Sequence, residues 1–200
     1  MPRRFAPRND KKDMKQIRLH GRGGQGVVTA AELIAIAAYH DGHQSQAFPS
    51  FGVERTGAPI QAFARIDDNF IRNREQVYNP DILIILDPTL IGLVDMTSDC
   101  NQDVKIIVNT AQPAEELNLA SGAKKEKIPL ENIFAVDATK IALEILGRNL
   151  ANTTILGALA KAVDLISIAG LREAIKEKFE EKGETVVKKN IEAIERAYSS

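Results

Sequence analysis

Residues 17–42 read IRLHGRGGQGVVTAAELIAIAAYHDG and place four glycines within six residues, between two apolar runs. The first run, IRLH, is typical of a strand, and the second, VVTAAELIAIAAYHD, predicts a helix that ends at Gly42. Gly21, Gly23 and Gly26 satisfy the pattern G-x-G-x-x-G, which permits a tight turn, close approach of a ligand and close packing of the helix on the strand. The stretch therefore predicts a strand, a glycine loop and a helix at the start of an α/β fold.

The rest of the chain continues this alternation. Further strands are predicted over residues 44–48, 59–67, 81–87, 105–110 and 133–138. Further helices are predicted over residues 139–148, 153–167, 171–182 and 184–199. Several of the strand candidates are short and almost continuously apolar, which favours interior parallel strands. We expect a doubly wound, Rossmann-like and mostly parallel sheet with a helical C-terminal layer.

The composition limits the classes of protein. With 200 residues, 44% apolar and 26% charged, the chain is expected to form a single domain over residues 15–200. Residues 1–14 form a basic leader with few apolar side chains, and we expect them to be disordered. The net charge of −1 gives no electrostatic support for nucleic-acid binding. Without a long apolar segment or a secretory signal, the protein is expected to avoid the membrane and to be cytoplasmic.

The chain holds one cysteine, Cys100. A single thiol excludes an internal disulfide, a cysteine-rich zinc site and a self-sufficient iron–sulfur cluster, which takes about four thiolates. We expect Cys100 to be a small, semi-buried side chain near a loop. Any redox metal must then be bound by another chain.

The glycine loop is the first candidate binding site. Free amides and the dipole at the start of the following helix favour an anion, and Arg22 can add a bidentate contact to it. A dinucleotide site needs an acidic residue ~20 positions further on, and no carboxylate lies between Asp41 and Glu54. This argues against NAD, although Arg22 or Arg55 can accept the extra phosphate of NADP. A glycine turn that serves packing alone is the third interpretation.

Other candidates follow the predicted strands, because ligands of such sheets gather beyond the carboxyl ends. These positions hold His20, Asp87, Asn109 and Asp137. Asp87 and Asp137 are also typical N-caps, and Asn109 is also typical of a turn. His20 is either a hydrogen-bonding group behind the glycine loop or a plain strand-end histidine.

Four stretches together resemble one family: HGRGGQG at 20–26, FPSFGVERTGAPIQAFARI at 48–66, VDAT at 136–139 and NTTILGAL at 152–159. From about Met14 onward the chain is similar to the gamma subunit of the pyruvate:ferredoxin oxidoreductases. The resemblance implies an enzyme that decarboxylates pyruvate with thiamine diphosphate, passes electrons through [4Fe–4S] clusters to ferredoxin or flavodoxin, and releases acetyl-CoA. It further implies that alpha and beta subunits hold the thiamine and that a delta subunit holds the clusters.

For this chain the resemblance implies a subunit that is inactive alone, with no catalytic residue and no metal. Coenzyme A is expected at a subunit interface. The residues expected to bind it are Gly21, Arg22, Gly23, Gly24, Gln25, Gly26, Arg55 and Asn109. The alternatives are a gamma subunit acting on 2-oxoglutarate, 2-oxoisovalerate or indolepyruvate, an NAD(P)-binding dehydrogenase, and a scaffold subunit whose loop binds nothing.

Overall fold

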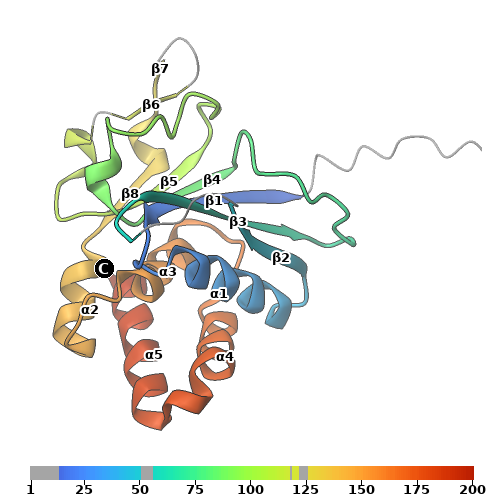
Figure 1. Cartoon of the computed structure of the whole chain (residues 1–200), viewed down its shortest axis with the longest axis vertical. Helices are drawn as coiled ribbons and strands as arrows, with labels where there is room; N and C mark the ends of the chain where they lie inside the picture. The colour runs from blue at the N-terminus through green and yellow to red at the C-terminus, as the bar shows by residue number, and fades with distance from the viewer. Residues whose placement is uncertain (1–13, 51–55, 118, 122–125) are drawn as a thin grey trace, which may run out of the picture.

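A computed structural model describes residues 14–50, 56–117, 119–121 and 126–200 (Figure 1). Except for Met14, the basic leader lies outside the described residues, and so does Arg55. No helix in the described part is long and apolar enough to cross a membrane.

Six strands form the main sheet, in the order β2-β3-β1-β4-β5-β8. They are β1 (Lys15–Arg22), β2 (Gln44–Pro49), β3 (Pro59–Asp67), β4 (Ile82–Ile85), β5 (Lys105–Asn109) and β8 (Ile133–Val136). β1, β4, β5 and β8 are parallel, whereas β3 runs antiparallel to both β1 and β2. Two short strands, β6 (Ala120–Ser121) and β7 (Glu126–Lys127), pair separately. The predicted α/β sheet, mostly parallel, is confirmed.

The helices gather on one face of the sheet, below it in Figure 1. They are α1 (Val27–His40), α2 (Ala138–Leu146), α3 (Ala151–Ala162), α4 (Ile168–Phe179) and α5 (Glu184–Ser199). Inward side chains of the strands, such as Ile17, Leu19 and Ile84, form one buried cluster with these helices. α1 is apolar almost all round because β1, β2 and β3 cover one side of it and α3 and α4 cover others. The predicted helical C-terminal layer is present.

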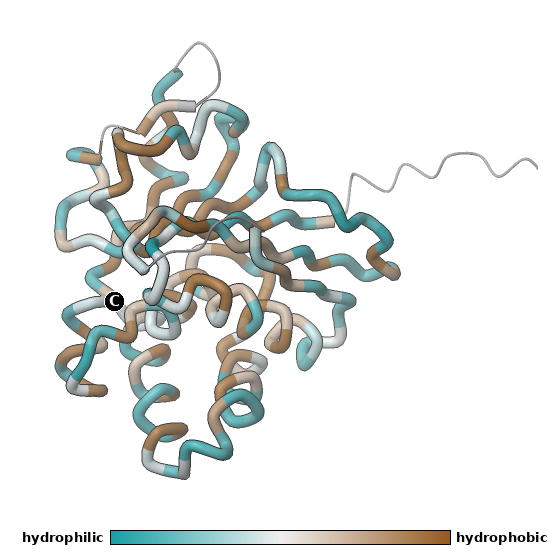
Figure 2. The backbone as a smooth tube through the Cα atoms, viewed as in Figure 1, coloured by the Kyte–Doolittle hydropathy of each residue, from teal (hydrophilic) through white to brown (hydrophobic). Residues whose placement is uncertain are grey.

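Irregular chain and short 3-10 turns cover the opposite face. Leu83, Ile85 and Ile106 point to this side and pack with Leu90 and Met96 from the connection between β4 and β5. Figure 2 shows the central strands as hydrophobic, as expected for strands that are buried on both faces. Both faces of the sheet are therefore covered, but helices cover only one. The β4–β5 connection, DPTLIGLVDMTSDCNQD, is too rich in turn-forming residues to make a helix.

Buried arginines attach this irregular layer to the sheet. Arg18 of β1 donates two 2.7 Å hydrogen bonds to the Asp99 carboxylate and one of 2.7 Å to the Met96 carbonyl. Arg65 of β3 donates to the Glu75 carbonyl at 2.5 Å. Because a buried guanidinium is stable only when its donors are used, these contacts fix the positions of loops that have no regular structure.

Candidate functional site

The glycine loop joins β1 to α1 at the carboxyl edge of the parallel strands. Gly26 has φ 75°, a left-handed conformation that favours glycine. A Cβ at Gly26 would overlap the amide of Asn152, which itself donates a 3.2 Å hydrogen bond to the Gly26 carbonyl. A Cβ at Gly21 would lie 2.6 Å from Val27 Cγ2. These two glycines therefore allow close packing of helix on strand, whether or not the loop binds a ligand.

Arg22 ties the glycine loop to two other segments. Its Nη1 donates to the Gly57 carbonyl at 3.1 Å, which holds the chain that leads into β3. On the β4 side, Nε donates to Asp87 Oδ2 at 3.1 Å and Nη2 to Thr89 Oγ1 at 3.0 Å. These contacts use three of the five N–H groups of the guanidinium. The charge of Arg22 is therefore held in one place, and further donors remain for an anion.

Asp87 is the centre of this network. It accepts a 2.8 Å hydrogen bond from Gln25 Nε2 and bonds of 3.0 and 2.6 Å from the Thr89 amide and hydroxyl. Burial is the largest single influence on the carboxyl group and raises its pKa. The hydrogen bonds from Thr89 and Gln25 and the charge of Arg22 together outweigh burial, so the pKa of Asp87 lies below its ordinary value of 3.8. Asp87 is therefore ionised at neutral pH and orients Arg22.

Replacing Asp87 by Asn should lower the free energy of unfolding at pH 7 by about 1 to 2 kcal/mol, because charge-assisted hydrogen bonds become neutral ones. The pKa of Asp87 is lower in the folded than in the unfolded protein, so its stabilisation is present at neutral pH and is lost as the pH falls through the folded pKa. Chemical denaturation of both proteins at a series of pH values should show a difference that shrinks below about pH 4.

The control is Asp103→Asn, since Asp103 is an exposed carboxylate. This variant should differ little from the wild type at any of these pH values. A constant difference between wild type and Asp87→Asn down to about pH 2 would contradict the assigned role of the carboxylate.

The N-terminus of α1 opens beside Arg22. In the described residues no side chain caps this helix, and its first turn holds no acidic residue. The Ala30 amide donates to the Gly26 carbonyl at 3.0 Å, so the amides before Ala30 have no partner within the helix. Positive partial charge and free N–H groups at this end favour an anion.

Two of the other predicted site residues have internal partners. Asn109 is buried, and its amide donates to the Leu86 carbonyl and to Thr139 Oγ1, both at 2.9 Å, while its oxygen accepts from the Thr139 amide at 3.1 Å. It joins β4, β5 and α2. Asp137 accepts from the Lys140 amide at 2.9 Å and caps α2, as its N-cap interpretation predicts. Asp87 likewise caps the short turn at Pro88–Leu90.

His20 and Cys100 are buried, and neither side chain is charged at neutral pH. Burial and the charge of Arg18 lower the pKa of His20 to about 3, so the imidazole is neutral. Burial raises the pKa of the Cys100 thiol to about 11, which makes it a poor nucleophile. No group of three or more His, Cys, Asp or Glu side chains in the described residues is arranged to hold a metal ion. Cys100 is buried rather than semi-buried, and it belongs to the apolar cluster on the face of the sheet opposite the helices.

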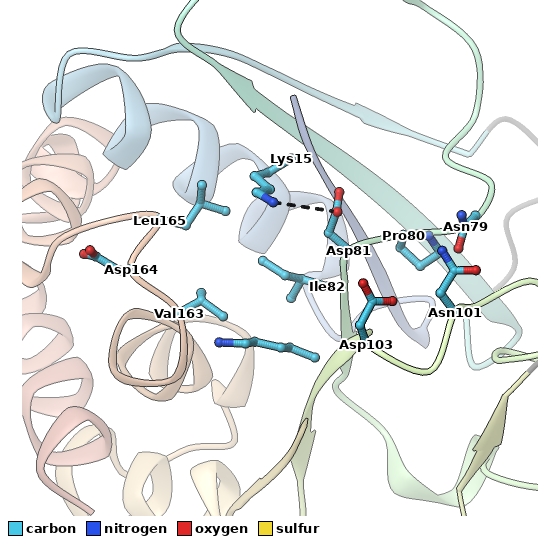
Figure 3. A pocket seen from close by; sticks show the side chains of 11 residues that line it. Lys15, Asn79, Pro80, Asp81, Ile82, Asn101, Asp103, Val163, Asp164 and Leu165 are labelled. Carbon is cyan, nitrogen blue, oxygen red and sulfur yellow. Dashed lines mark ion pairs between the residues drawn. The ribbon is translucent and has the colours of Figure 1, made fainter. Parts of the chain in front are cut away.

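A separate cavity of about 280 Å³ lies at the opposite edge of the sheet (Figure 3). It is lined by charges of both signs, with Lys15 Nζ 3.9 Å from Asp81 Oδ1. These residues stand at or just before the amino ends of β1 and β4. Since ligands of α/β sheets bind beyond the carboxyl ends, the glycine loop remains the stronger candidate.

Sequence reasoning missed the residues that support the loop. Thr89, Gly57 and Asn152 all contact the loop, but they lie far from it in the sequence. Gly57 is 34 positions from its partner Gly23, and Asn152 is 126 positions from its partner Gly26. The sequence points to Asn152 only in that this residue begins NTTILGAL, one of the four stretches that carry the family resemblance. That stretch also contains Gly157, where α3 packs directly on the backbone of α5.

Residues 16–200 match the protein family described as pyruvate ferredoxin/flavodoxin oxidoreductase. The chain is 48% identical over 186 residues to the pyruvate/ketoisovalerate oxidoreductases common subunit gamma of Thermococcus kodakarensis, covering 93% of this chain and 96% of that protein. It is 50% identical over 163 residues to the pyruvate synthase subunit PorC of Methanosarcina barkeri, covering 82% of this chain and 85% of that protein.

Two solved structures share the fold. The pyruvate oxidoreductase subunit PORC of Thermotoga maritima matches with a TM-score of 0.77 at 34% identity, covering 94% of this chain and 97% of that chain. A 2-oxoglutarate:ferredoxin oxidoreductase of Magnetococcus marinus, solved with 2-oxoglutarate, coenzyme A and succinyl-CoA bound, matches with a TM-score of 0.68 at 21% identity. That match covers 94% of this chain and 31% of the longer chain, and it bears on the fold alone.

Proposed function

The chain belongs to the pyruvate ferredoxin/flavodoxin oxidoreductase family as a gamma-type subunit of pyruvate synthase, and we propose that it holds coenzyme A against the catalytic subunits without supplying a catalytic group. The observation that carries this proposal is the N-terminus of α1, which no described side chain caps, beside the fixed charge of Arg22. Coenzyme A is rich in phosphate, and phosphates are the anions that such helix ends favour.

The glycine loop supplies the binding chemistry in this proposal. Arg22 approaches a phosphate with its remaining N–H groups, while its contacts with Asp87, Thr89 and the Gly57 carbonyl hold the guanidinium in place. A charge that is already ordered loses less side-chain entropy when the ligand arrives. Gly24, with φ 92°, keeps the backbone open where the ligand comes close.

Thiamine diphosphate and [4Fe–4S] clusters belong to alpha, beta and delta subunits in this proposal. The residues of this chain do not fit a cluster, because its single cysteine cannot supply the thiolates and the thiol is buried with a raised pKa. Decarboxylation and electron transfer to ferredoxin or flavodoxin are therefore assigned to the partners. The same proposal places the assembled enzyme in the cytoplasm.

The substitution Arg22→Ala tests this role in the assembled enzyme. We expect the KM for coenzyme A to rise by about ten- to a hundredfold, since a charge-assisted hydrogen bond is worth about 1.5 to 3 kcal/mol. The KM for pyruvate should stay close to its wild-type value. Steady-state kinetics with each substrate varied in turn measure both quantities.

Two controls separate ligand binding from packing. Thr89→Ala removes one partner of Arg22 but leaves its charge, and should raise the KM for coenzyme A much less. Titration of the isolated chain with coenzyme A and with NADP distinguishes the remaining interpretations of the loop. Unchanged coenzyme A kinetics in an intact Arg22→Ala complex would leave the loop with a packing role only, and saturable NADP binding would favour the dehydrogenase.

A further inference from the structure

β2 is an edge strand with an open hydrogen-bonding side (Figure 1). The Ser50 amide donates to the Gln61 carbonyl at 3.0 Å, in the same register as the β2–β3 pairing. Hydrogen-bonded pairs alternate along an antiparallel ladder, so the even-numbered residues of β2 bond to β3. The amides and carbonyls of Ser45 and Ala47 therefore point away from the sheet, and no described backbone group bonds to them.

This edge lacks the usual protection against pairing with another chain. Natural sheets protect exposed edges with charged side chains, bulges or prolines. β2 reads QSQAFP, with no charged residue and a proline only at its last position. An edge of this kind can accept a strand from another polypeptide.

A groove of about 410 Å³ lies beside β2. Its lining combines apolar side chains, Phe48 of β2 with Phe70 and Ile71 of the loop after β3, with polar side chains of β2. Figure 2 shows hydrophobic colour in that loop, and Phe70 is 77% exposed. Arg74 is the charged residue of the lining and forms no ion pair with any described side chain.

We propose that β2 docks an extended segment of another subunit of the same oxidoreductase. The segment adds a strand by bonding to the backbone of Ser45 and Ala47, places an apolar side chain between Phe48 and Phe70, and sets a carboxylate against Arg74. The proposal rests on the assignment of this chain as a subunit. It goes further by naming the surface and the chemistry of the partner segment, an acidic and apolar strand.

A second copy of this chain fits the edge less well. In a symmetric dimer, the β2 strands of two copies would pair antiparallel about a two-fold axis, and the same face of each sheet would then point to the same side. The strand that would then lie beside the groove, QSQAFP, holds no carboxylate to set against Arg74. Charge complementarity therefore favours an acidic partner segment over self-pairing.

The test places a photoreactive phenylalanine analogue at position 70 of the assembled complex. Irradiation should join this chain to an extended, acidic segment of one of the other subunits, which peptide mass spectrometry identifies. A cross-link to a second copy of this chain, or to no subunit at all, would overturn the proposal. Copurification of the unlabelled complex is checked first, because its failure would count against the subunit assignment itself.

Reversing the charge of Arg74 or of Arg72 compares a residue that lines the groove with one that does not. Arg74→Glu should weaken association with the other subunits by at least about fivefold, since an attraction is replaced by a repulsion. Arg72→Glu makes the same charge change two positions away at an exposed residue outside the groove lining and should change affinity by less than about twofold. Equal effects of the two variants would show a general charge effect and contradict a specific groove.

Ala47→Pro tests the strand addition directly. The proline removes an amide that points away from β3, so the β2–β3 ladder keeps its own hydrogen bonds. We expect a normal circular dichroism spectrum for the free chain and about tenfold weaker association with the other subunits. A folded Ala47→Pro chain that assembles as tightly as the wild type would exclude backbone pairing at this edge.

Discussion

The purified chain alone is expected to be colourless and to oxidise no pyruvate. Its one cysteine cannot ligate a [4Fe–4S] cluster, and that thiol is buried. The described residues also provide no cluster of metal-binding side chains. Under the proposed function, the decarboxylation and the redox chemistry occur on other subunits, to which this chain contributes through contact.

Adding the chain to alpha, beta and delta subunits should restore coenzyme A-dependent reduction of ferredoxin or of a dye, with pyruvate the best substrate. The effect is expected to be large, because the acetyl group cannot be transferred and turnover cannot continue when coenzyme A is not held. The same subunits with a heat-denatured sample of the chain serve as the control. Pyruvate oxidation by this chain alone, or the visible absorbance of an iron–sulfur cluster in it, would contradict the assignment.

The substitution Gly157→Ala should destabilise the chain by about 3 kcal/mol. Gly157 lies in α3, and a Cβ there would overlap the backbone carbonyl of Ile194 in α5 and lie 3.0 Å from the Tyr198 amide nitrogen. Backbone atoms cannot move aside as the end of a flexible side chain can. The two helices would have to separate, and buried contacts between them would be lost.

Helix propensity predicts the opposite sign, since alanine is favoured over glycine by about 1 kcal/mol within a helix. The sign of the measured change therefore decides between local preference and packing. Urea denaturation of Gly157→Ala is compared with Ala160→Gly, which removes a methyl group from the same helix and should cost about 1 kcal/mol. A Gly157→Ala chain as stable as the wild type would show that α3 and α5 are not closely packed.

Local patterns predicted much of the fold. The glycine spacing from Gly21 to Gly26 predicted the turn between β1 and α1, and the structure has β1 ending at Arg22 and α1 beginning at Val27. The apolar runs predicted all six strands of the main sheet, and the N-cap interpretation of Asp137 is confirmed. These features follow from the sequence because strand period, helix period and capping act over a few neighbouring residues.

The order of the strands was decided by tertiary structure. β1 lies between β3 and β4, which brings the Gly57 carbonyl, Asp87 and Thr89 around Arg22. The sequence gives Arg22 a charge and a place beside the glycines, but not these partners. Asn109 also follows a strand, yet its side chain bonds to Leu86 and Thr139 rather than being free for a ligand.

The sequence by itself therefore determined the strands of the main sheet, the approximate places of the five helices, the glycine loop and the lack of a metal-binding thiol set, but not β6, β7 or the end of α3 at Ala162. Tertiary structure decided that the described helices lie on one face, that Asn152 reaches Gly26 across 126 positions, and that β2 is the last strand at one edge of the described sheet. The physical reason is the range of the forces concerned. Backbone preferences and side-chain periodicity act between near neighbours, whereas these contacts depend on which surfaces of distant elements are complementary enough to pack together.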